Sequence, residues 1–138
     1  MLANRSIPRS TVIPELAYAD VSKATDWLCD AFGFTVRLRI ANHRVQINVG
    51  DGAFVVTEGH GSEGPAERAH SVMVRVEDVH SHHEHARQRG ARILRPPADH
   101  PYGERQYTVE DPGGHVWTFT QSIADVAPES WGGTSVQL

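Results

Sequence analysis

Three ionisable residues lie in segments that are predicted to form β-strands. Glu15, Glu58 and Arg75 are all expected on the inner face of a sheet. A charge on an inner face is costly unless it is paired or solvated. The three residues therefore indicate an open cavity, in which a Glu–Arg pair presents charge to a ligand. The alternative is that one or more of them lies at a solvated strand end.

Other side chains extend this candidate ligand site. Gln46 and Tyr107 are candidates to add polar groups to its wall. Trp131 lies in a turn-rich tail, yet its indole is too large an apolar group to be left in water without a contact. We expect Trp131 either to stack on a flat ligand or only to seal the sheet.

A run of histidines at residues 80–85 has the composition of a metal site. On a helix, the useful partners stand four positions apart. Here the residue four positions after His80 is Glu84, and the one after His82 is Ala86. The spacing therefore favours a solvated helix face.

The elements that position these residues follow from an internal repeat. Asp20 and Asp78 each precede a helix-like stretch and are 58 positions apart, and Gly33 and Gly90 end those stretches. Gly52 and Gly114 extend the repeat with a step of 62. Repetition at this spacing indicates two copies of one supersecondary unit, each too short to bury a full core alone.

The repeat predicts an α+β fold built from two tandem βαβββ modules, which form a curved mixed sheet around a cavity. We expect one domain over residues 1–138, with the repeat at residues 11–59 and 69–121. Residues 60–68 would be the linker and residues 122–138 a C-terminal tail. Residues 1–10 are expected to be loose, and the segment from Pro96 to Gly103 is expected to be an exposed loop.

Composition excludes several classes of protein. The net charge of −4 argues against a nucleic-acid partner. No apolar run approaches the roughly 20 residues of a membrane span, so no membrane partner is expected. The first residues lack the apolar core of a signal peptide. A single cysteine, Cys29, cannot form an internal disulfide, which suits the cytoplasm.

The second half contains the most specific motif. It runs from Tyr107 to Trp117 and includes Asp111, Pro112 and Gly113. With the repeated modules, this strand–turn–strand segment resembles the vicinal oxygen chelate superfamily, which includes glyoxalases, bleomycin-resistance proteins and extradiol dioxygenases. The resemblance covers about residues 11–121 and implies the fold, but the fold hosts unrelated chemistries.

The resemblance also provides a test for a metal site. Enzymes of the superfamily bind a divalent metal with one side chain from each of four strands, usually His, Gln or Glu. The matching positions in this chain are Ile13, Val56, Ser71 (or His70, one place away) and Thr118. Ile and Val cannot coordinate a metal, and hydroxyls are weak ligands. Only His70 suits the role, and only if a bulge turns it inward, so we expect no cofactor and no tightly bound metal.

The resemblance to the bleomycin-resistance branch implies a metal-free protein that binds or sequesters a small, antibiotic-like molecule in the groove of a homodimer. The excess of acidic over basic residues, 17 against 13, favours a cationic ligand. The alternative is a metal-dependent lyase or dioxygenase with an atypical site built on His70 with Glu15 or Glu58. A third hypothesis is an isomerase that uses one of these two glutamates as a base. The pattern assigns no catalytic residue.

Overall fold

Both helices begin at an aspartate that caps their first turn. In the computed structural model, which describes residues 3–59 and 71–135, Asp20 accepts a hydrogen bond from the Lys23 amide (3.0 Å) at the start of α1 (Val21–Phe32). Asp78 accepts one from the Ser81 amide (3.1 Å) at the start of α2 (Val79–Gln88). Such caps satisfy amides that have no partner within the helix. Their repetition confirms that the two halves begin alike.

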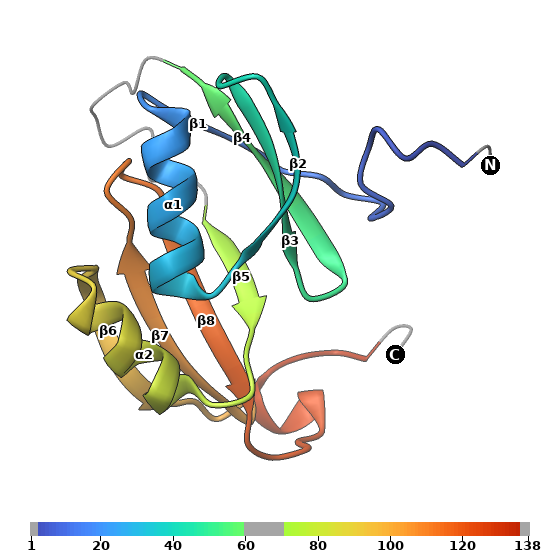
Figure 1. The fold of residues 1–138 in the computed structure, drawn as a ribbon. Helices are drawn as coiled ribbons and strands as arrows, with labels where there is room; N and C mark the ends of the chain where they lie inside the picture. Colours follow the sequence, from blue (N-terminus) through green and yellow to red (C-terminus); the bar gives the residue numbers. More distant parts are fainter. Residues whose placement is uncertain (1–2, 60–70, 136–138) are drawn as a thin grey trace. The chain divides into compact units, whose positions relative to one another are not determined.

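Within the described residues, eight strands complete the two modules (Figure 1). Each module has one strand, one helix and then three strands, as predicted. The strands are β1 (Glu15–Tyr18), β2 (Thr35–Ile40), β3 (Arg44–Val49), β4 (Gly52–Glu58), β5 (Val72–Arg75), β6 (Arg92–Asp99), β7 (Glu104–Glu110) and β8 (Val116–Ser122). A short 3-10 helix, η2 (Pro128–Trp131), follows in the tail.

The chain separates into two compact units. The first unit contains the first module together with residues 111–115, the turn between β7 and β8. Its sheet has the order β1-β4-β3-β2, with β1 and β4 parallel and the other pairs antiparallel. Helix α1 contacts β2, β3 and β4, and its buried residues, including Leu28, recur at helical spacing.

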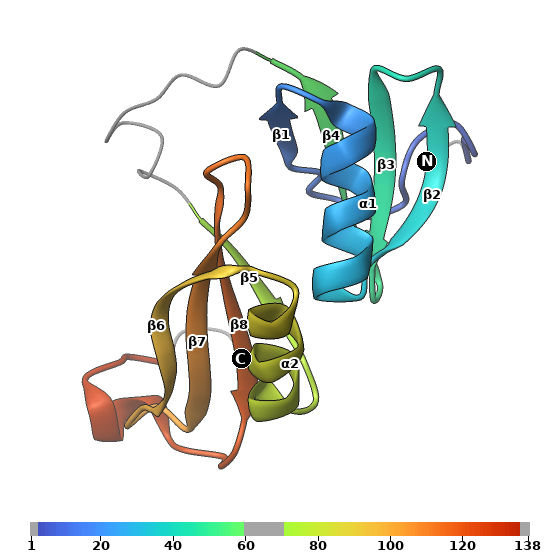
Figure 2. The ribbon, with the colours of Figure 1, turned by 60° about the vertical axis from the view of Figure 1, so that its left-hand side comes forward.

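The second unit repeats this arrangement. Its sheet has the order β5-β8-β7-β6, and β5 and β8 are parallel. Helix α2 lies against the sheet (Figure 2) and contacts β6, β7 and β8. The core beneath α2 contains Tyr107, Val109, Trp117 and Phe119, each no more than 1% exposed.

Two expectations about irregular segments were wrong. The segment that contains Pro96 and Pro97 belongs to β6, where the pairing with β7 is irregular between Arg95 and Ala98. Proline cannot donate to a sheet ladder, but β6 is an edge strand, so one side of it needs no donors. Part of the described N-terminal segment, which begins at residue 3, is also held in place, because Gln46 donates a hydrogen bond to the Ser6 carbonyl (2.8 Å) and Pro8 is buried.

Candidate functional site

The sheet of the second unit has one face that α2 does not cover. Register pairs Met73 with Thr118, and Arg75 with Thr120, on the face opposite Trp117 and Phe119. Register across β7 places more polar side chains on this face. We call it the second open face, and it comprises Met73, Arg75, Glu104, Gln106, Thr108, Thr118 and Thr120. Met73 is 62% exposed, so apolar surface is accessible beside the polar groups.

A directed chain of hydrogen bonds crosses the second open face. The Tyr102 hydroxyl donates to Oε1 of Gln106 (3.0 Å), and Nε2 of Gln106 donates to Oγ1 of Thr120 (3.1 Å). The Thr120 hydroxyl then donates to Oε1 of Glu104 (2.7 Å). Each group polarises the next, and the chain ends at a carboxylate. The arrangement stabilises negative charge on Glu104.

The pKa of Glu104 reflects this environment. A hydrogen bond from the Ser122 side chain lowers it most, and the Thr120 hydroxyl and the charge of Arg75 lower it further, against partial burial. Glu104 is therefore an ionised carboxylate at neutral pH, on the same face as a guanidinium. Arg75 is exposed and lies on that face, as predicted.

An aromatic cluster lies beside this polar row. The Tyr102 ring stacks on His100 with a centroid separation of 5.1 Å and meets the Trp131 indole edge-on at 5.5 Å. Trp131 remains 45% exposed. The tail therefore docks its indole onto an aromatic side chain and leaves part of the ring exposed.

In the first unit, several polar side chains on the corresponding face are already paired. Glu15 forms a salt bridge with Arg44, and both side chains remain partly exposed. Gln46 is buried, and its amide oxygen accepts a hydrogen bond from Arg37 (2.5 Å) while its nitrogen donates to Ser6. Gln46 thus anchors the N-terminal segment. This role was not predicted, because the segment has no pattern of its own.

Two predicted wall residues lie on the opposite faces of their sheets. Glu58 pairs in register with Tyr18, so it lies on the side of the sheet that α1 covers, at an exposed strand end. Tyr107 pairs with Phe119 and is buried, with its hydroxyl oxygen 2.6 Å from Nδ1 of His82 on α2. The expectation that both residues line the cavity was therefore wrong. Val56 shares the error, because it pairs with the helix-facing Leu16.

The residues available for a metal do not fit one. Because Val56 faces α1, the candidate ligand position on β4 is Val55, which pairs with Glu15. Its side chain is equally unable to coordinate a metal. Ser71 and Thr118 offer only hydroxyls, and His70 lies outside the described residues. Within residues 3–59 and 71–135, no group of three or more His, Cys, Asp or Glu could hold a metal.

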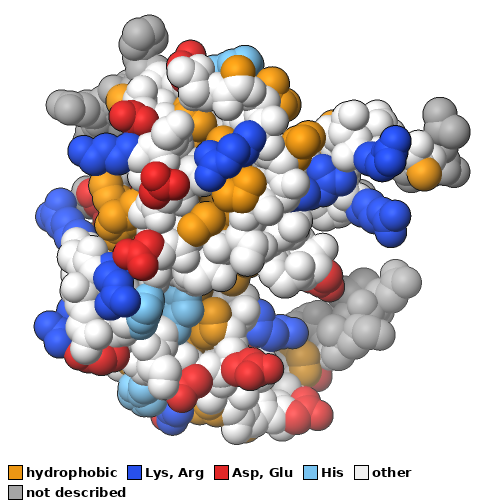
Figure 3. Space-filling view, in the orientation of Figure 1, with side chains coloured by type: hydrophobic (Ala, Val, Ile, Leu, Met, Phe, Trp, Pro, Cys, Tyr) orange, Lys and Arg blue, Asp and Glu red, His pale blue; other side chains and the backbone are white. Residues whose placement is uncertain are grey.

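The histidine run lies on α2, and histidine side chains gather there on the surface (Figure 3). His82 is an exception to the expected solvated face, because its ring contacts Tyr107 and packs on Phe119 with a centroid separation of 4.0 Å. His80 and His85 are exposed. The run is therefore part surface and part core.

Comparison with known proteins supports the same fold. The family model described as "Glyoxalase/Bleomycin resistance protein/Dioxygenase superfamily" matches residues 11–119. The chain belongs to this superfamily. A search of curated proteins found no match.

Solved structures of similar proteins share this fold. TioX from Micromonospora sp. ML1 is 35% identical, with a TM-score of 0.68 over 86% of this chain and 100% of that chain. A superfamily protein from Nocardioides is 22% identical, with a TM-score of 0.60 over 94% and 90%. Another from Alicyclobacillus acidocaldarius is 13% identical, with a TM-score of 0.68 over 86% and 95%. For the last two proteins, which are only 22% and 13% identical, the likeness concerns the fold alone.

No helix in the described part of the chain is long and apolar enough to cross a membrane.

Sequence reasoning missed Glu104, Gln106 and Thr120 as a connected set. The signal was present, because polar residues alternate with apolar ones in β7 and β8. Alternation of period two places such residues on one face. Pairing the two strands in register would have brought the three side chains together.

Proposed function

We propose that this protein binds a small, flat molecule on the second open face, without metal-dependent chemistry. The observation that carries the proposal is a face that holds both a hydrogen-bonded carboxylate, Glu104, and the exposed Met73. The exposed Trp131 indole packs on Tyr102, where the chain of hydrogen bonds to Glu104 begins. A few placed polar groups within an apolar surround are typical of small-molecule sites.

The chemistry of the face favours a ligand with a ring and a positive charge. An indole that is 45% exposed offers a face on which a ring or a cation can stack. Glu104 offers an ionised acceptor, and the chain as a whole carries a net charge of −4. Arg75 would pair with an acidic group if the ligand carries one as well.

The side chains at the expected metal-ligand positions favour binding over metal-dependent catalysis. The positions that match the metal ligands of the superfamily's enzymes hold Ile13, Val55, Ser71 and Thr118 in this chain. Sequestration of an antibiotic-like molecule, as in the bleomycin-resistance branch, requires no metal. We therefore favour sequestration over the lyase and dioxygenase alternatives.

The proposal includes a cytoplasmic homodimer with the ligand groove between two chains. A second chain would cover apolar surface that the described part of this chain leaves exposed, such as Met73. Sedimentation at micromolar concentration tests this part. If the protein is a monomer at that concentration, the proposal of a groove between two chains is wrong. Titration with a ligand would then test binding to the single chain.

A thermal-shift screen of cationic aromatic antibiotics and metabolites tests the binding proposal. A compound that binds only the native state must raise the melting temperature. Each hit is then titrated against Glu104→Gln, Trp131→Ala and, as a matched control, Glu58→Gln. We expect the first two variants to weaken binding about tenfold, and the control to bind like the wild type.

The control makes the test specific to the site. Glu58→Gln makes the same change of charge as Glu104→Gln, but on the side of the first sheet that α1 covers. If both glutamine variants lose affinity equally, the effect is one of net charge, and the second open face is not the site. Hits that bind all three variants like the wild type would also reject it.

A further inference from the structure

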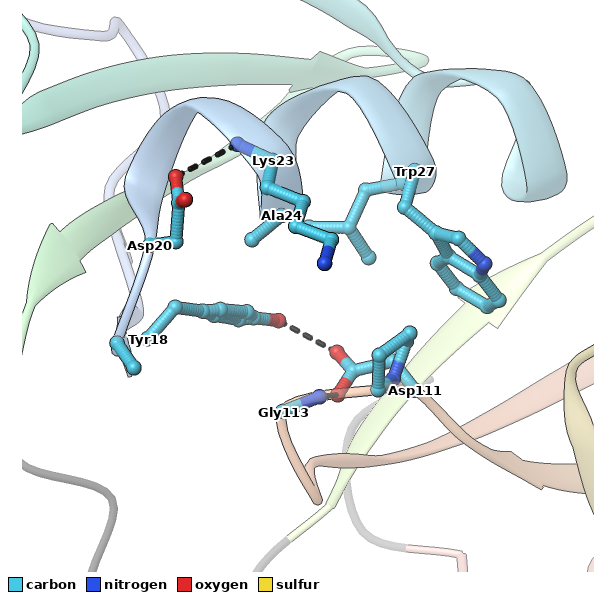
Figure 4. A pocket seen from close by; sticks show the side chains of 10 residues that line it. Tyr18, Asp20, Lys23, Ala24, Trp27, Asp111 and Gly113 are labelled. Carbon is cyan, nitrogen blue, oxygen red and sulfur yellow. Dashed lines mark hydrogen bonds between the residues drawn. The ribbon is translucent and has the colours of Figure 1, made fainter.

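The first unit contains a pocket of about 290 Å³, which lies between α1 and the turn that starts at Asp111 (Figure 4). Its wall is apolar, formed by Ala24, Trp27 and Leu28 on α1 and by Pro112 on the turn. An apolar cavity of about 150 Å³ holds one benzene ring. This pocket therefore has room for two fused rings. It is separate from the second open face, so the inference stands apart from the proposed function.

The floor of the pocket is a buried pair of oxygen groups. Tyr18 is 2% exposed and Asp111 is 3% exposed, and the Tyr18 hydroxyl donates to Oδ2 of Asp111 (2.5 Å). Oδ1 of Asp111 accepts from the amides of Gly113 (2.9 Å) and His115 (3.0 Å). These bonds fix the carboxylate and hold the phenol in one orientation.

Neither floor group has a proton to give to a ligand. A carboxylate carries none, and a phenol carries one, which Tyr18 donates to Asp111. Burial, together with the charge of Asp111, raises the pKa of Tyr18, so the phenol keeps its proton and its donating role. The floor therefore presents oxygen lone pairs, which repel a carbonyl or ether oxygen and attract an N–H or O–H group.

The pocket's cationic group has a different position. Lys23 extends from α1 toward the Tyr18–Asp111 pair, and its side chain is exposed (Figure 4). The carboxylates of Asp20 and Asp111 also line the pocket and offset this charge, and burial of a charged guest against the apolar wall is costly, so the pocket favours an uncharged guest.

We propose that this pocket binds a small, uncharged aromatic molecule that directs one N–H or O–H donor at the Tyr18 oxygen. The ring lies between Trp27 and Pro112 and against Ala24. The donor supplies the hydrogen bond that the floor can only accept.

Indole and benzofuran are the probes, because they have the same shape and differ in one atom. Indole carries an N–H, and benzofuran has an ether oxygen at that position. Titration followed by ¹H–¹⁵N correlation spectra should show indole shifting the amide signals of Lys23, Ala24 and Gly113 and the indole N–H signal of Trp27. We expect benzofuran to bind roughly tenfold more weakly, because it leaves the acceptor without a donor.

A variant that fills the pocket tests the location. Ala24→Leu adds bulk to the wall without a helix-breaking residue, and it should abolish the indole shifts. Ser22→Leu is the matched control, because Ser22 is exposed on the same helix and does not line the pocket. It should bind indole like the wild type.

Three results would overturn the proposal. The first is that indole causes no shifts at these residues in the wild type at millimolar concentration. The second is that benzofuran binds as tightly as indole, and the third is that folded Ala24→Leu binds indole unchanged. If Ala24→Leu does not fold, the comparison of the two probes on the wild type still decides.

Discussion

The hydrogen bond between Tyr18 and Asp111 should be one of the strongest single contacts in the first unit. Both residues are almost fully buried, and the two oxygens are 2.5 Å apart. Tyr18→Phe removes one donor from the carboxylate and leaves the two amide donors of Gly113 and His115 in place. Because a hydrogen bond to a charged group contributes about 1.5–3 kcal/mol, we expect a loss of this size in the free energy of unfolding.

A double-mutant cycle with Asp111→Asn separates this bond from the other effects of each change. The asparagine side chain can still accept from the backbone amides, but it presents an uncharged group to Tyr18. The two single changes should couple by at least about 1 kcal/mol, as residues in one hydrogen-bond network do. Urea unfolding followed by both fluorescence and circular dichroism gives the free energies, and coincident curves confirm that one transition is measured.

The control cycle replaces Tyr18→Phe with Tyr102→Phe. Tyr102 donates to Gln106 in the second unit and has no bond to Asp111 among those in the described residues. Its change should therefore be additive with Asp111→Asn to within about 0.5 kcal/mol. Additivity in the Tyr18 cycle as well would refute the reasoning, because the short contact would then contribute no coupling energy.

Three further predictions concern pH and helix capping. Burial raises the pKa of Tyr18 and of Tyr107. The stability that the two protonated phenols contribute is therefore complete below their unfolded pKa of about 10 and should be lost as the pH rises further. Tyrosine absorbance at 295 nm should increase together with unfolding. The pKa of Glu104 is lowered, so its contribution is present above about pH 4.3 and is lost as the pH falls; Thr120→Val should reduce this loss in acid urea titrations. Asp20→Ala should destabilise the first unit by about 1 kcal/mol in urea, because it removes the cap of α1.

The order of the elements could be predicted because its signals are local. An aspartate side chain caps its own helix, and a glycine such as Gly33, with φ of 78°, ends it through its own backbone freedom. Neither signal requires knowledge of the rest of the chain. The superfamily assignment had the same basis, since the motif around Asp111 is continuous in sequence.

The positions of Gln46 and Tyr107 could not be derived in this way. Gln46 is held by Arg37 and by a backbone carbonyl forty positions away, in a segment without any periodic pattern. Tyr107 has a polar group that suggested an accessible wall, but His82 satisfies that group within the core. Contacts between distant parts of the chain depend on packing, which a pattern within one strand does not describe.

The error at Val56 has a simple geometric cause, which also explains the pocket. In the first half, Val49 pairs with Gly52, so two residues join β3 and β4; in the second half, Glu110 pairs with Val116, so five residues join β7 and β8. Gly52 therefore begins a strand, whereas Gly114 lies within a turn, and the two are not equivalent as the repeat had suggested. Val55 pairs with Glu15, and Thr118 pairs with Met73, so Val55 corresponds to Thr118 at a step of 63 rather than the assumed 62. A shift by one residue exchanges the two faces of a strand.

The second half has the longer turn, which groups with the first unit and contains Asp111, the hydrogen-bond partner of Tyr18. The residue that corresponds to Tyr18 in the second half, at the step of 58, is Val76, which has no hydroxyl. The pocket therefore depends on two departures from the repeat, one in loop length and one in residue type. Aligning the halves emphasises what they share, and for that reason it could not reveal a pocket that depends on the differences between them.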